Sequence, residues 1–575
     1  MSLRKIFAEV FWALYAAVAV SGFAHQCFGA QTLAKKGTLL VPHTKTSQDD
    51  LLLSPELGRD GLASLKYGKN ELLGDGRFDV KKVVFTRPDG TSVRHALGRG
   101  TQSVDVNKRC VTRAYPWGVV RCTIIPAGGR LNFDIAISNR SGDILSGVLL
   151  QLLTLKLPRG IQSFEDGVRA GSNVDAPTVV GAGYEGGALA VANDDVTRPL
   201  YFGLPSGELK KPGAVFPLLA STYRDEVFPS KWMASPRIAR PIYPGETDHL
   251  HLSLRVGPAG QPPDNLAMDV YRKYAAAYPS HLTWKDQRPI GYLNLSVTIP
   301  HPDSGKNPRG WFSNDPVVDV TTPEGRKALQ SRLLALADHC IPILKATNAQ
   351  GVIIWDIEGQ EYPHAMSYVG DPRHLPEEIE PVADRFFQKF QDAGLRVGVC
   401  LRTQKPVKSL YGDVAEQLQV ADNFYNLNDK ISYAKTRWGC TLFYVDSNVH
   451  FDLGTNPSDE KDYELLPAHL FQEAAAANPD VLLIPEQQIT RYYAYGAPYD
   501  ELKQGTAATP TAIRRIYPDS FTVISVATDT SGGPLDTRRA ELIDSVRHGD
   551  ILLFRAWYET PEMKPVQEIY KATGR

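Results

Sequence analysis

The chain has 575 residues, of which 43% are hydrophobic and 22% are charged, so it is long enough for two or three domains with substantial cores. Its 63 Lys and Arg side chains balance 64 Asp and Glu side chains, for a net charge of -1. This balance excludes the basic surface typical of nucleic-acid-binding proteins and the charge excess typical of disordered chains.

The first 30 residues have the pattern of a secretory signal. Arg4 and Lys5 precede an apolar run over residues 10–20, and Ala30 offers a small residue at the cleavage position. The run is short for a membrane span, and no later segment approaches about 20 apolar residues. We therefore expect residues 1–30 to be removed and the mature protein to be secreted or periplasmic, without a stable membrane anchor.

Residues 31–257 read as an all-β sandwich domain. A hairpin is indicated at residues 82–95, and further strand-like runs lie at residues 121–125, 131–137 and 148–157. Cys110 and Cys122 bracket a second turn, so they are candidates for a disulfide after export, provided that the hairpin places them face to face.

Residues 258–287 form a linker that is rich in Pro and Gly and carries a helix over residues 265–278. Residues 288–575 alternate short apolar runs with helical segments, the pattern of a TIM-like (β/α)₈ barrel. No eighth strand is evident after Arg555, so either the barrel is incomplete or one strand lies elsewhere. The predicted strands are 290–297, 352–356, 396–401, 441–446, 481–485, 521–526 and 551–554, and the helices between them are 324–346, 377–393, 428–438, 466–477 and 537–547.

Charged side chains follow several of the predicted strands, where a barrel places its catalytic groups. Asp446 and Glu486 end neighbouring strands, which lie about 4.8 Å apart. A pair of carboxylates at such a separation suits cleavage of a glycosidic bond, because one group protonates the leaving oxygen and the other attacks the sugar carbon. Asp446 and Glu486 are the predicted catalytic pair.

Other polar and aromatic residues near the same strand ends are candidates for binding a sugar through hydroxyl contacts and ring stacking. These predicted substrate-binding residues are Asp356, Glu358, Arg402, Tyr444, Asn448, Tyr492, Asp529, Arg555 and Trp557.

The segments Phe443-Tyr-Val-Asp446-Ser and Ile484-Pro-Glu486, in a chain that combines a sandwich with a barrel, resemble retaining glycoside hydrolases. The layout is most similar to the endo-α-N-acetylgalactosaminidase families and more distantly to the α-galactosidases. The resemblance implies that Asp446 is the nucleophile and Glu486 the acid/base. In the α-galactosidase pattern the acid comes from the sixth strand, and Asp529 occupies a comparable place here.

The resulting hypothesis is a secreted glycoside hydrolase that acts on an oligosaccharide, a polysaccharide or a glycoprotein glycan. One alternative is an inverting glycosidase with Asp356 or Asp529 as the acid, and another is a carbohydrate-binding protein with a degenerate barrel. The sequence has no motif for a metal, a nucleotide phosphate or a flavin, so we expect no metal site and no cofactor.

Overall fold

The computed structural model describes most of the chain from residue 53 onward. The predicted signal at residues 1–30 lies outside the described residues, as do Asn448 and Asp529. The described residues are 53–59, 61–87, 89, 91–93, 97–157, 160–164, 179–198, 200–204, 213–222, 240–296, 305–359, 370–403, 405–408, 415–418, 423–446, 449–450, 464–486, 488–502, 508–526, 535, 537–557 and 562–574.

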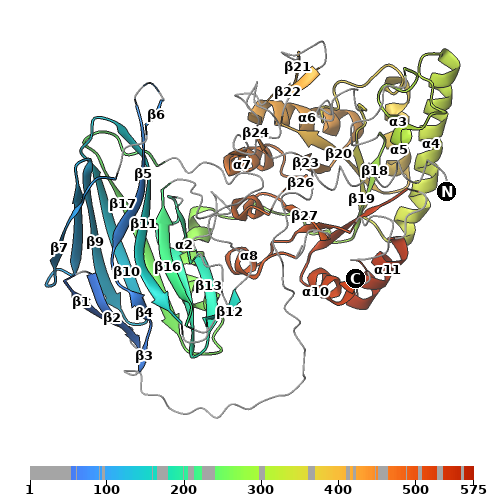
Figure 1. The fold of residues 1–575 in the computed structure, drawn as a ribbon. Coiled ribbons are helices and arrows are strands. Elements are labelled where there is room, and N and C mark those ends of the chain that lie inside the picture. Colours follow the sequence, from blue (N-terminus) through green and yellow to red (C-terminus); the bar gives the residue numbers. More distant parts are fainter. Residues whose placement is uncertain are drawn as a thin grey trace, which may run out of the picture.

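Stacked antiparallel sheets form the first part of the fold (Figure 1). One sheet has the strand order β12-β13-β14-β17-β10-β9-β8-β7, the second has the order β15-β16-β11-β5-β6 with β4 beside β11, and β1-β2-β3 form a smaller sheet. The strands are β1 Leu53–Gly58, β2 Gly61–Tyr67, β3 Asn70–Glu71, β4 Leu73–Asp75, β5 Asp79–Thr86, β6 Ser92–Val93, β7 Thr101–Asp105, β8 Cys110–Tyr115, β9 Gly118–Ala127, β10 Arg130–Asn139, β11 Ile144–Lys156, β12 Ile161–Phe164, β13 Val179–Tyr184, β14 Gly187–Asn193, β15 Tyr201–Gly203, β16 Val215–Ser221 and β17 Thr247–Gly257.

Strand β10 shows why this segment forms a two-layered structure. Leu131, Phe133, Ile135 and Ile137 alternate with polar or small residues, and the four apolar side chains are at most 1% exposed. A period of two directs them all to one face of the strand. They join a buried apolar cluster with residues of the second sheet, such as Val148 of β11, so the core lies between the two layers.

The predicted pairing of Cys110 with Cys122 is wrong. β8 and β9 do form the expected hairpin, but its register pairs Cys122 with Val111 and Cys110 with Thr123. Because neighbouring residues of a strand point to opposite faces, this one-residue offset places the two thiols on opposite sides of the sheet. Both cysteines are free, and burial in the core raises the pKa of the Cys122 thiol.

The predicted linker helix packs against both parts of the fold. Its elements are η2 (Pro263–Ala267) and α2 (Met268–Ala277), and their apolar residues share one buried cluster with β14 and with the barrel. The Arg255 side chain, 2% exposed, binds Asp269 of α2 and lies 2.6 Å from Asp194 Oδ1. On the barrel side, Arg515 Nε donates to Asp264 at 2.8 Å. The segment is therefore a buried joint between the sandwich and the barrel.

Eight parallel strands make up the second part of the fold, as expected (Figure 1). The order β26-β23-β20-β19-β18-β29-β28-β27 is closed into a barrel by a parallel bridge between Glu486 and Tyr499. The strands are β18 Ile290–Asn294, β19 Gly351–Trp355, β20 Arg396–Arg402, β23 Leu442–Asp446, β26 Leu482–Pro485, β27 Tyr499–Glu501, β28 Val523–Ser525 and β29 Ile551–Arg555.

The remaining elements of the barrel are mostly helices on its outer side. They are α3 Trp311–Asn314, α4 Pro323–Ala346, α5 Glu380–Asp392, α6 Asn423–Trp438, α7 Ala468–Ala477, η5 Thr490–Ala494, α8 Thr511–Ile516, α10 Arg539–Arg547 and α11 Met563–Thr573, with two short ribbons, β21 Lys405–Lys408 with β22 Ala415–Leu418 and β24 Val449–His450 with β25 Glu464–Leu465.

The strand missing from the sequence prediction is β27, which is sixth in chain order. It spans only three residues, Tyr499, Asp500 and Glu501, and two of them carry carboxylates. It lacks the continuous apolar run that marks the other strands. Because β27 lies between the predicted fifth and sixth strands, the segments predicted as strands six and seven are the seventh and eighth.

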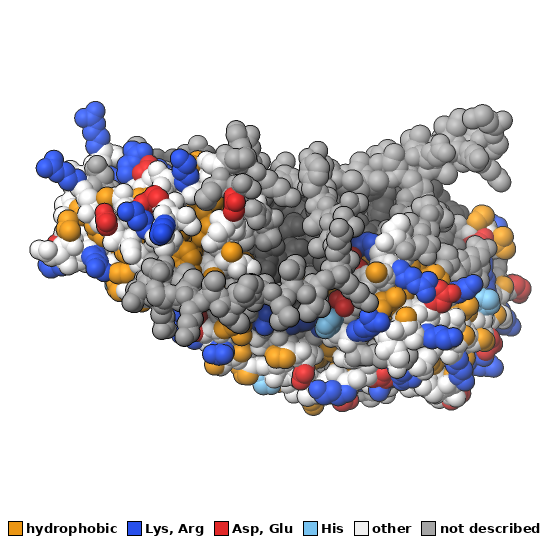
Figure 2. Space-filling model, turned by 90° about the horizontal axis from the view of Figure 1, so that it is seen from below, with side chains coloured by type: hydrophobic (Ala, Val, Ile, Leu, Met, Phe, Trp, Pro, Cys, Tyr) orange, Lys and Arg blue, Asp and Glu red, His pale blue; other side chains and the backbone are white. Residues whose placement is uncertain are grey.

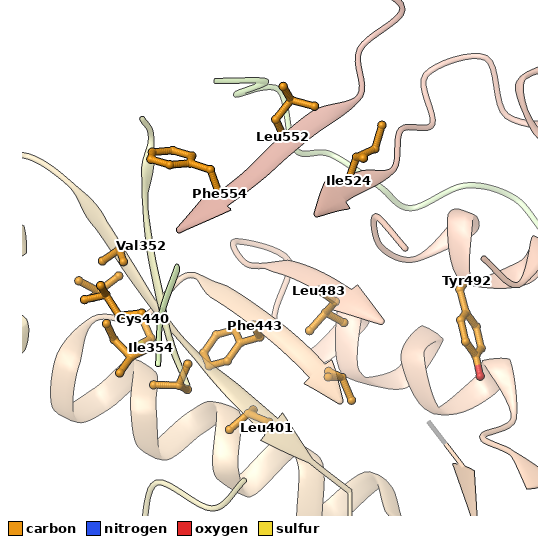
Figure 3. Packing of buried hydrophobic residues seen from close by; sticks show 14 of the residues in the cluster. Val352, Ile354, Leu401, Cys440, Phe443, Leu483, Tyr492, Ile524, Leu552 and Phe554 are labelled. Carbon is orange, nitrogen blue, oxygen red and sulfur yellow. The ribbon is translucent and has the colours of Figure 1, made fainter. Parts of the chain in front are cut away.

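The strand residues divide cleanly between two apolar regions. Side chains such as Ile353 and Tyr444 belong to the cluster that fills the barrel interior. Their neighbours Ile354 and Phe443 belong to the cluster between the strands and the helices (Figure 3). The strand register can be followed from Tyr292 across each neighbouring strand in turn. After one circuit of the barrel it reaches the position eight residues before Tyr292. This is the shear of a (β/α)₈ barrel, in which alternate strands contribute four inward side chains to each layer.

Candidate functional site

The barrel mouth is defined here as the C-terminal ends of the eight strands. The strand register places four inward-pointing residues at one level of this end: Trp355, Asp446, Glu501 and Arg555. These four residues are called the mouth layer. The layer directly below contains Tyr292, Cys400, Glu486 and Ser525. The two predicted catalytic residues therefore belong to adjacent layers, with Asp446 nearer to the opening.

Asp446 is held by the arginine that ends the neighbouring strand. The register places Arg402 beside Asp446, and Arg402 Nε and Nη2 lie 2.8 and 2.7 Å from Asp446 Oδ2. Gly398, lower on β20, allows this close packing, because a Cβ at that position would lie 1.9 Å from the carbonyl oxygen of Leu442. The short carboxylate is thus oriented by a charge-assisted hydrogen bond and an ion-pair contact to one of its oxygens.

Asp356 reaches the same site by a break in the strand geometry. Regular alternation would direct it away from the interior, opposite to Trp355, but its φ is +58°, in the left-handed region that L-residues rarely adopt. Its side chain lies near Ser296, Arg402 and Asp446 and is 1% exposed. Burial, reinforced by the charge of Glu358, raises the pKa of Asp356 well above its usual value. Backbone strain of this kind is often concentrated at functional sites.

Glu358 belongs to a group of charges hereafter named the Lys430 cluster. In this group Glu358, Asp371 and Lys430 are buried and Arg373 is half-buried. Glu358 Oε1 accepts a hydrogen bond from Asp371 N at 3.0 Å. Burial raises the pKa of Glu358 to about 7 and lowers that of Lys430 to about 8. Arg373 donates to both carboxylate oxygens of Asp371 at 2.8 and 2.7 Å, and the pKa of Asp371 is lowered.

Glu501 is the mouth residue that the sequence prediction missed. It shares the inward parity of Tyr499, whose hydroxyl donates to Glu501 Oε1 at 3.1 Å and whose ring packs on Tyr444 at 4.9 Å between centroids. Asp500 points the other way, toward Arg538 outside the barrel, and burial raises its pKa to about 7. The requirement that an eight-stranded barrel close was the signal that a strand had to exist between residues 485 and 521.

Arg555 carries its own counter-ion. Its backbone N and its Nε donate to the two carboxylate oxygens of Glu562 at 2.8 and 2.7 Å, and the Glu562 side chain is fully buried. The guanidinium also lies 5.8 Å from the centre of the Trp557 ring. Trp557 in turn packs edge-on against Tyr292, with 5.3 Å between the ring centres. Arg555 and Trp557 therefore form one side of the barrel mouth.

Aromatic rings form a floor beneath the carboxylates. Trp355 packs against Tyr292 and Tyr444, with 5.2 and 4.8 Å between ring centres, and Tyr444 continues the row to Tyr499. Tyr444 is only 4% exposed, so it supports the mouth from below. Tyr444 and Tyr499 thus lie under Asp446 and Glu501, and Trp355 lies beside these carboxylates in the mouth layer.

The structure does not place Tyr492 at the mouth. This residue lies on η5, is fully buried, and packs on Phe471 at 4.5 Å between ring centres (Figure 3). Its hydroxyl donates to the Leu466 carbonyl oxygen at 2.6 Å. Of the other predicted ligands, Asn448 and Asp529 lie outside the described residues.

On the face drawn in Figure 2, Lys and Arg side chains are interspersed with Asp and Glu side chains. Within the described ranges, no group of three His, Cys, Asp or Glu residues is arranged to hold a metal ion. None of the helices described from residue 53 onward combines the length and apolar character needed to cross a lipid bilayer.

No protein-family model and no curated protein matches this chain. Among solved structures, it is similar to the galactosidase domain of alpha-galactosidase-sucrose kinase, AgaSK, with 11% identity, a TM-score of 0.44 and coverage of 90% of this chain and 76% of that one. It is also similar to the alpha-galactosidase from Lactobacillus brevis, with 11% identity, a TM-score of 0.45 and coverage of 93% and 79%. A third similar structure is the GH36 alpha-galactosidase AgaA from Geobacillus stearothermophilus, with 12% identity, a TM-score of 0.43 and coverage of 96% and 82%. At these values the likeness is distant, and the case for a function rests on the residues of the barrel mouth.

Proposed function

We propose that this chain is a glycoside hydrolase that cleaves O-glycosidic bonds with retention of configuration. The observation that carries the proposal is the pair of carboxylates, Asp446 and Glu501, that the register assigns to one layer of the mouth on alternate strands. Two strand spacings separate their backbones by about 10 Å, and the inward side chains narrow that gap. A gap of this kind admits a sugar ring between an attacking group and a proton donor.

In the proposed reaction Asp446 is the nucleophile. One carboxylate oxygen attacks the anomeric carbon while the bond to the leaving oxygen breaks, and the acid transfers its proton to that oxygen. Water then attacks the same carbon, the deprotonated acid takes up a proton from the water, and the bond to Asp446 breaks. The hydrogen bond and the ion pair from Arg402 hold the carboxylate for the attack.

Two residues compete for the acid/base role. Glu486 is the candidate implied by the family resemblance, but the register assigns it to the layer below Asp446 and to the adjacent strand. Glu501 is in the same layer as Asp446, and β26 separates the strands that carry the two residues. This position suits an acid, which must approach the glycosidic oxygen from a different direction than the nucleophile approaches the anomeric carbon. We therefore propose Glu501 as the acid/base.

Hydrolysis of a panel of aryl glycosides, with product stereochemistry followed by NMR, tests the proposal. Asp446→Asn should abolish turnover and leave folding intact, because the side chain keeps its shape and loses the attacking charge. Asp480→Asn, a surface substitution near the opposite end of β26, is the matched control. Near-wild-type turnover of an activated substrate by Asp446→Asn would eliminate Asp446 as the nucleophile.

The acid is identified by comparing leaving groups. Glu501→Gln should slow substrates with poor leaving groups by about 10²–10⁴-fold and activated ones far less, and azide should restore product as a glycosyl azide. Glu486→Gln and Asp529→Asn provide the comparison. If either of these shows the selective loss while Glu501→Gln does not, the acid belongs to that residue instead.

A second candidate is an inverting glycosidase with Asp356 as the acid. The observation in its favour is the pKa of Asp356, which burial raises well above the usual value, the direction that a proton donor requires. NMR of the first-formed product separates the two mechanisms directly. Inversion together with a selective leaving-group defect in Asp356→Asn would replace the retaining proposal.

We also propose that the mature protein begins near Gln31 and acts on carbohydrate outside the cytoplasm. The support is the charged start, the short apolar run and the small residue at position 30. Intact-mass analysis and N-terminal analysis of protein from the native host test this proposal. An uncleaved chain in the cytoplasm would refute it.

A further inference from the structure

The end of β20 is held by a set of buried contacts that the proposed reaction does not use directly. Lys430 of α6 donates from Nζ to the Arg402 carbonyl oxygen at 2.7 Å, and its side chain is 0% exposed. Asn426, one turn earlier on α6, donates from Nδ2 to the Thr403 carbonyl oxygen at 2.5 Å. Two side chains of one helix therefore fix consecutive carbonyl groups at the strand end.

The backbone amide of Arg402 is fixed as well. Arg402 N donates to the Gly370 carbonyl oxygen at 3.2 Å. The segment at Gly370 approaches so closely that a Cβ there would lie 2.4 Å from Arg402 N, and the φ of Gly370 is +56°. Backbone amide and carbonyl of Arg402 are both engaged, so the base of its side chain has little freedom.

Burying an ammonium group is costly unless charge compensates it. Lys430 Nζ lies 3.9 Å from Asp371 Oδ2, and Glu358 adds a second favourable charge above its own pKa of about 7. Arg373 and Arg402 oppose the charge of Lys430, and desolvation lowers its pKa to about 8. An apolar side chain of similar volume, such as Met, would fill this space without the cost of burying a charge, so the lysine provides something other than packing.

We propose that Lys430 is a positioning residue for catalysis, which fixes the Arg402 backbone and through the Arg402 guanidinium sets the orientation of Asp446. The role rests on the proposed function, because orientation of Asp446 matters only if that carboxylate reacts. Lys430 itself does not touch the substrate. Its effect is transmitted through the Arg402 backbone carbonyl and through the hydrogen bond and ion pair from Arg402 to Asp446.

The test compares Lys430→Met with Lys435→Met in the full-length mature chain. Lys435 is on the same helix and pairs with Asp480 at the surface, away from the mouth. Lys430→Met should lower kcat on an aryl glycoside by about 10²-fold with little change in KM, since a displacement of about 1 Å at a catalytic group costs this much. Lys435→Met should retain wild-type kinetics.

The alkaline limb of the kcat profile provides a second readout. As the pH rises through about 8, the wild-type lysine loses its charge and its contact weakens, so kcat should fall there. Lys430→Arg keeps the charge at all accessible pH values, so it should recover activity relative to Lys430→Met and lack this limb. If Lys430→Met does not fold, Lys430→Gln, which keeps a donor without the charge, takes its place in the comparison.

Hydrogen exchange separates failure of this proposal from failure of the proposed function. The amides of residues 398–403 should exchange faster in Lys430→Met than in Lys435→Met, whether or not any glycoside is hydrolysed. Wild-type protein that hydrolyses nothing on the panel refutes the proposed function. Unchanged exchange at residues 398–403, or wild-type kcat with the alkaline limb intact in Lys430→Met, overturns the positioning role.

Discussion

The buried carboxylate of Glu358 should make the stability of the barrel depend on pH in a defined window. Its side chain is 4% exposed, and burial raises its pKa from the usual 4.5 to about 7, with the Asp371 charge adding to the effect. Between these two pH values the folded chain holds a proton that the unfolded chain has released. The contribution of Glu358 to stability therefore falls as the pH rises from 4.5 to 7.

The expected size follows from the same two values. At about 1.4 kcal/mol for each pH unit, the rise in pKa from 4.5 to about 7 corresponds to roughly 3 kcal/mol. Glu358→Gln removes the titration and keeps the acceptor oxygen for the Asp371 amide. The variant should therefore gain roughly 3 kcal/mol relative to wild type between pH 4.5 and pH 8, with little further change above pH 8.

Urea unfolding at pH 4.5, 6, 7 and 8, compared between the variant and wild type, measures this difference. The comparison cancels the titration of shared groups that lie far from Glu358, and the points at pH 4.5 to 7 lie below the pKa of Lys430, the neighbour that Glu358 affects. Glu377→Gln is the matched control, because that side chain is 76% exposed and pairs with Arg326 at the surface. A wild-type curve that runs parallel to the Glu358→Gln curve across this range would refute the assignment of a raised pKa to Glu358.

Two further substitutions test the packing of the barrel. Gly398→Ala should destabilise the barrel by about 3 kcal/mol or prevent folding, because its Cβ would meet the Leu442 carbonyl oxygen. The control is Gly142→Ala, whose Cβ has no neighbour within 4 Å, and its unfolding midpoint in urea should equal that of the wild type. Tyr492→Phe should lose about 1–3 kcal/mol, because the hydrogen bond to the Leu466 carbonyl oxygen is removed in a buried site, and should leave KM for aryl glycosides unchanged. A raised KM with unchanged stability would show that Tyr492 reaches the substrate.

Sequence patterns were sufficient where a local period encodes burial. The apolar runs that end at Asp446 and Glu486 predicted two barrel strands and their order, and the alternation in residues 131–137 predicted a sandwich strand. They also indicated that Arg402 and Asp446 lie near one another, because parallel strands end at the same side of a sheet. Each of these inferences starts from a local apolar run and from the polar residue that ends it.

The features that required the tertiary structure all depend on contacts between distant segments. A three-residue strand such as β27 is stable only because its neighbours close the barrel around it, and Glu501 belongs to the mouth only once that strand exists. Cys110 and Cys122 point to opposite faces of the sheet because the β8–β9 register is offset by one residue from the one that would pair them. No local sequence pattern specifies this register.

The chain by itself thus determined the two fold types and the strand-end carboxylate Asp446, because hydrophobic periodicity and strand order are properties of the sequence. The tertiary structure alone decided which charged groups are buried together. Lys430 looks like a surface residue of a helix, yet it is fully buried against the end of β20. The physical reason is that the cost of burying a charge is offset only by partners that folding brings from elsewhere in the chain, here Asp371 and Glu358.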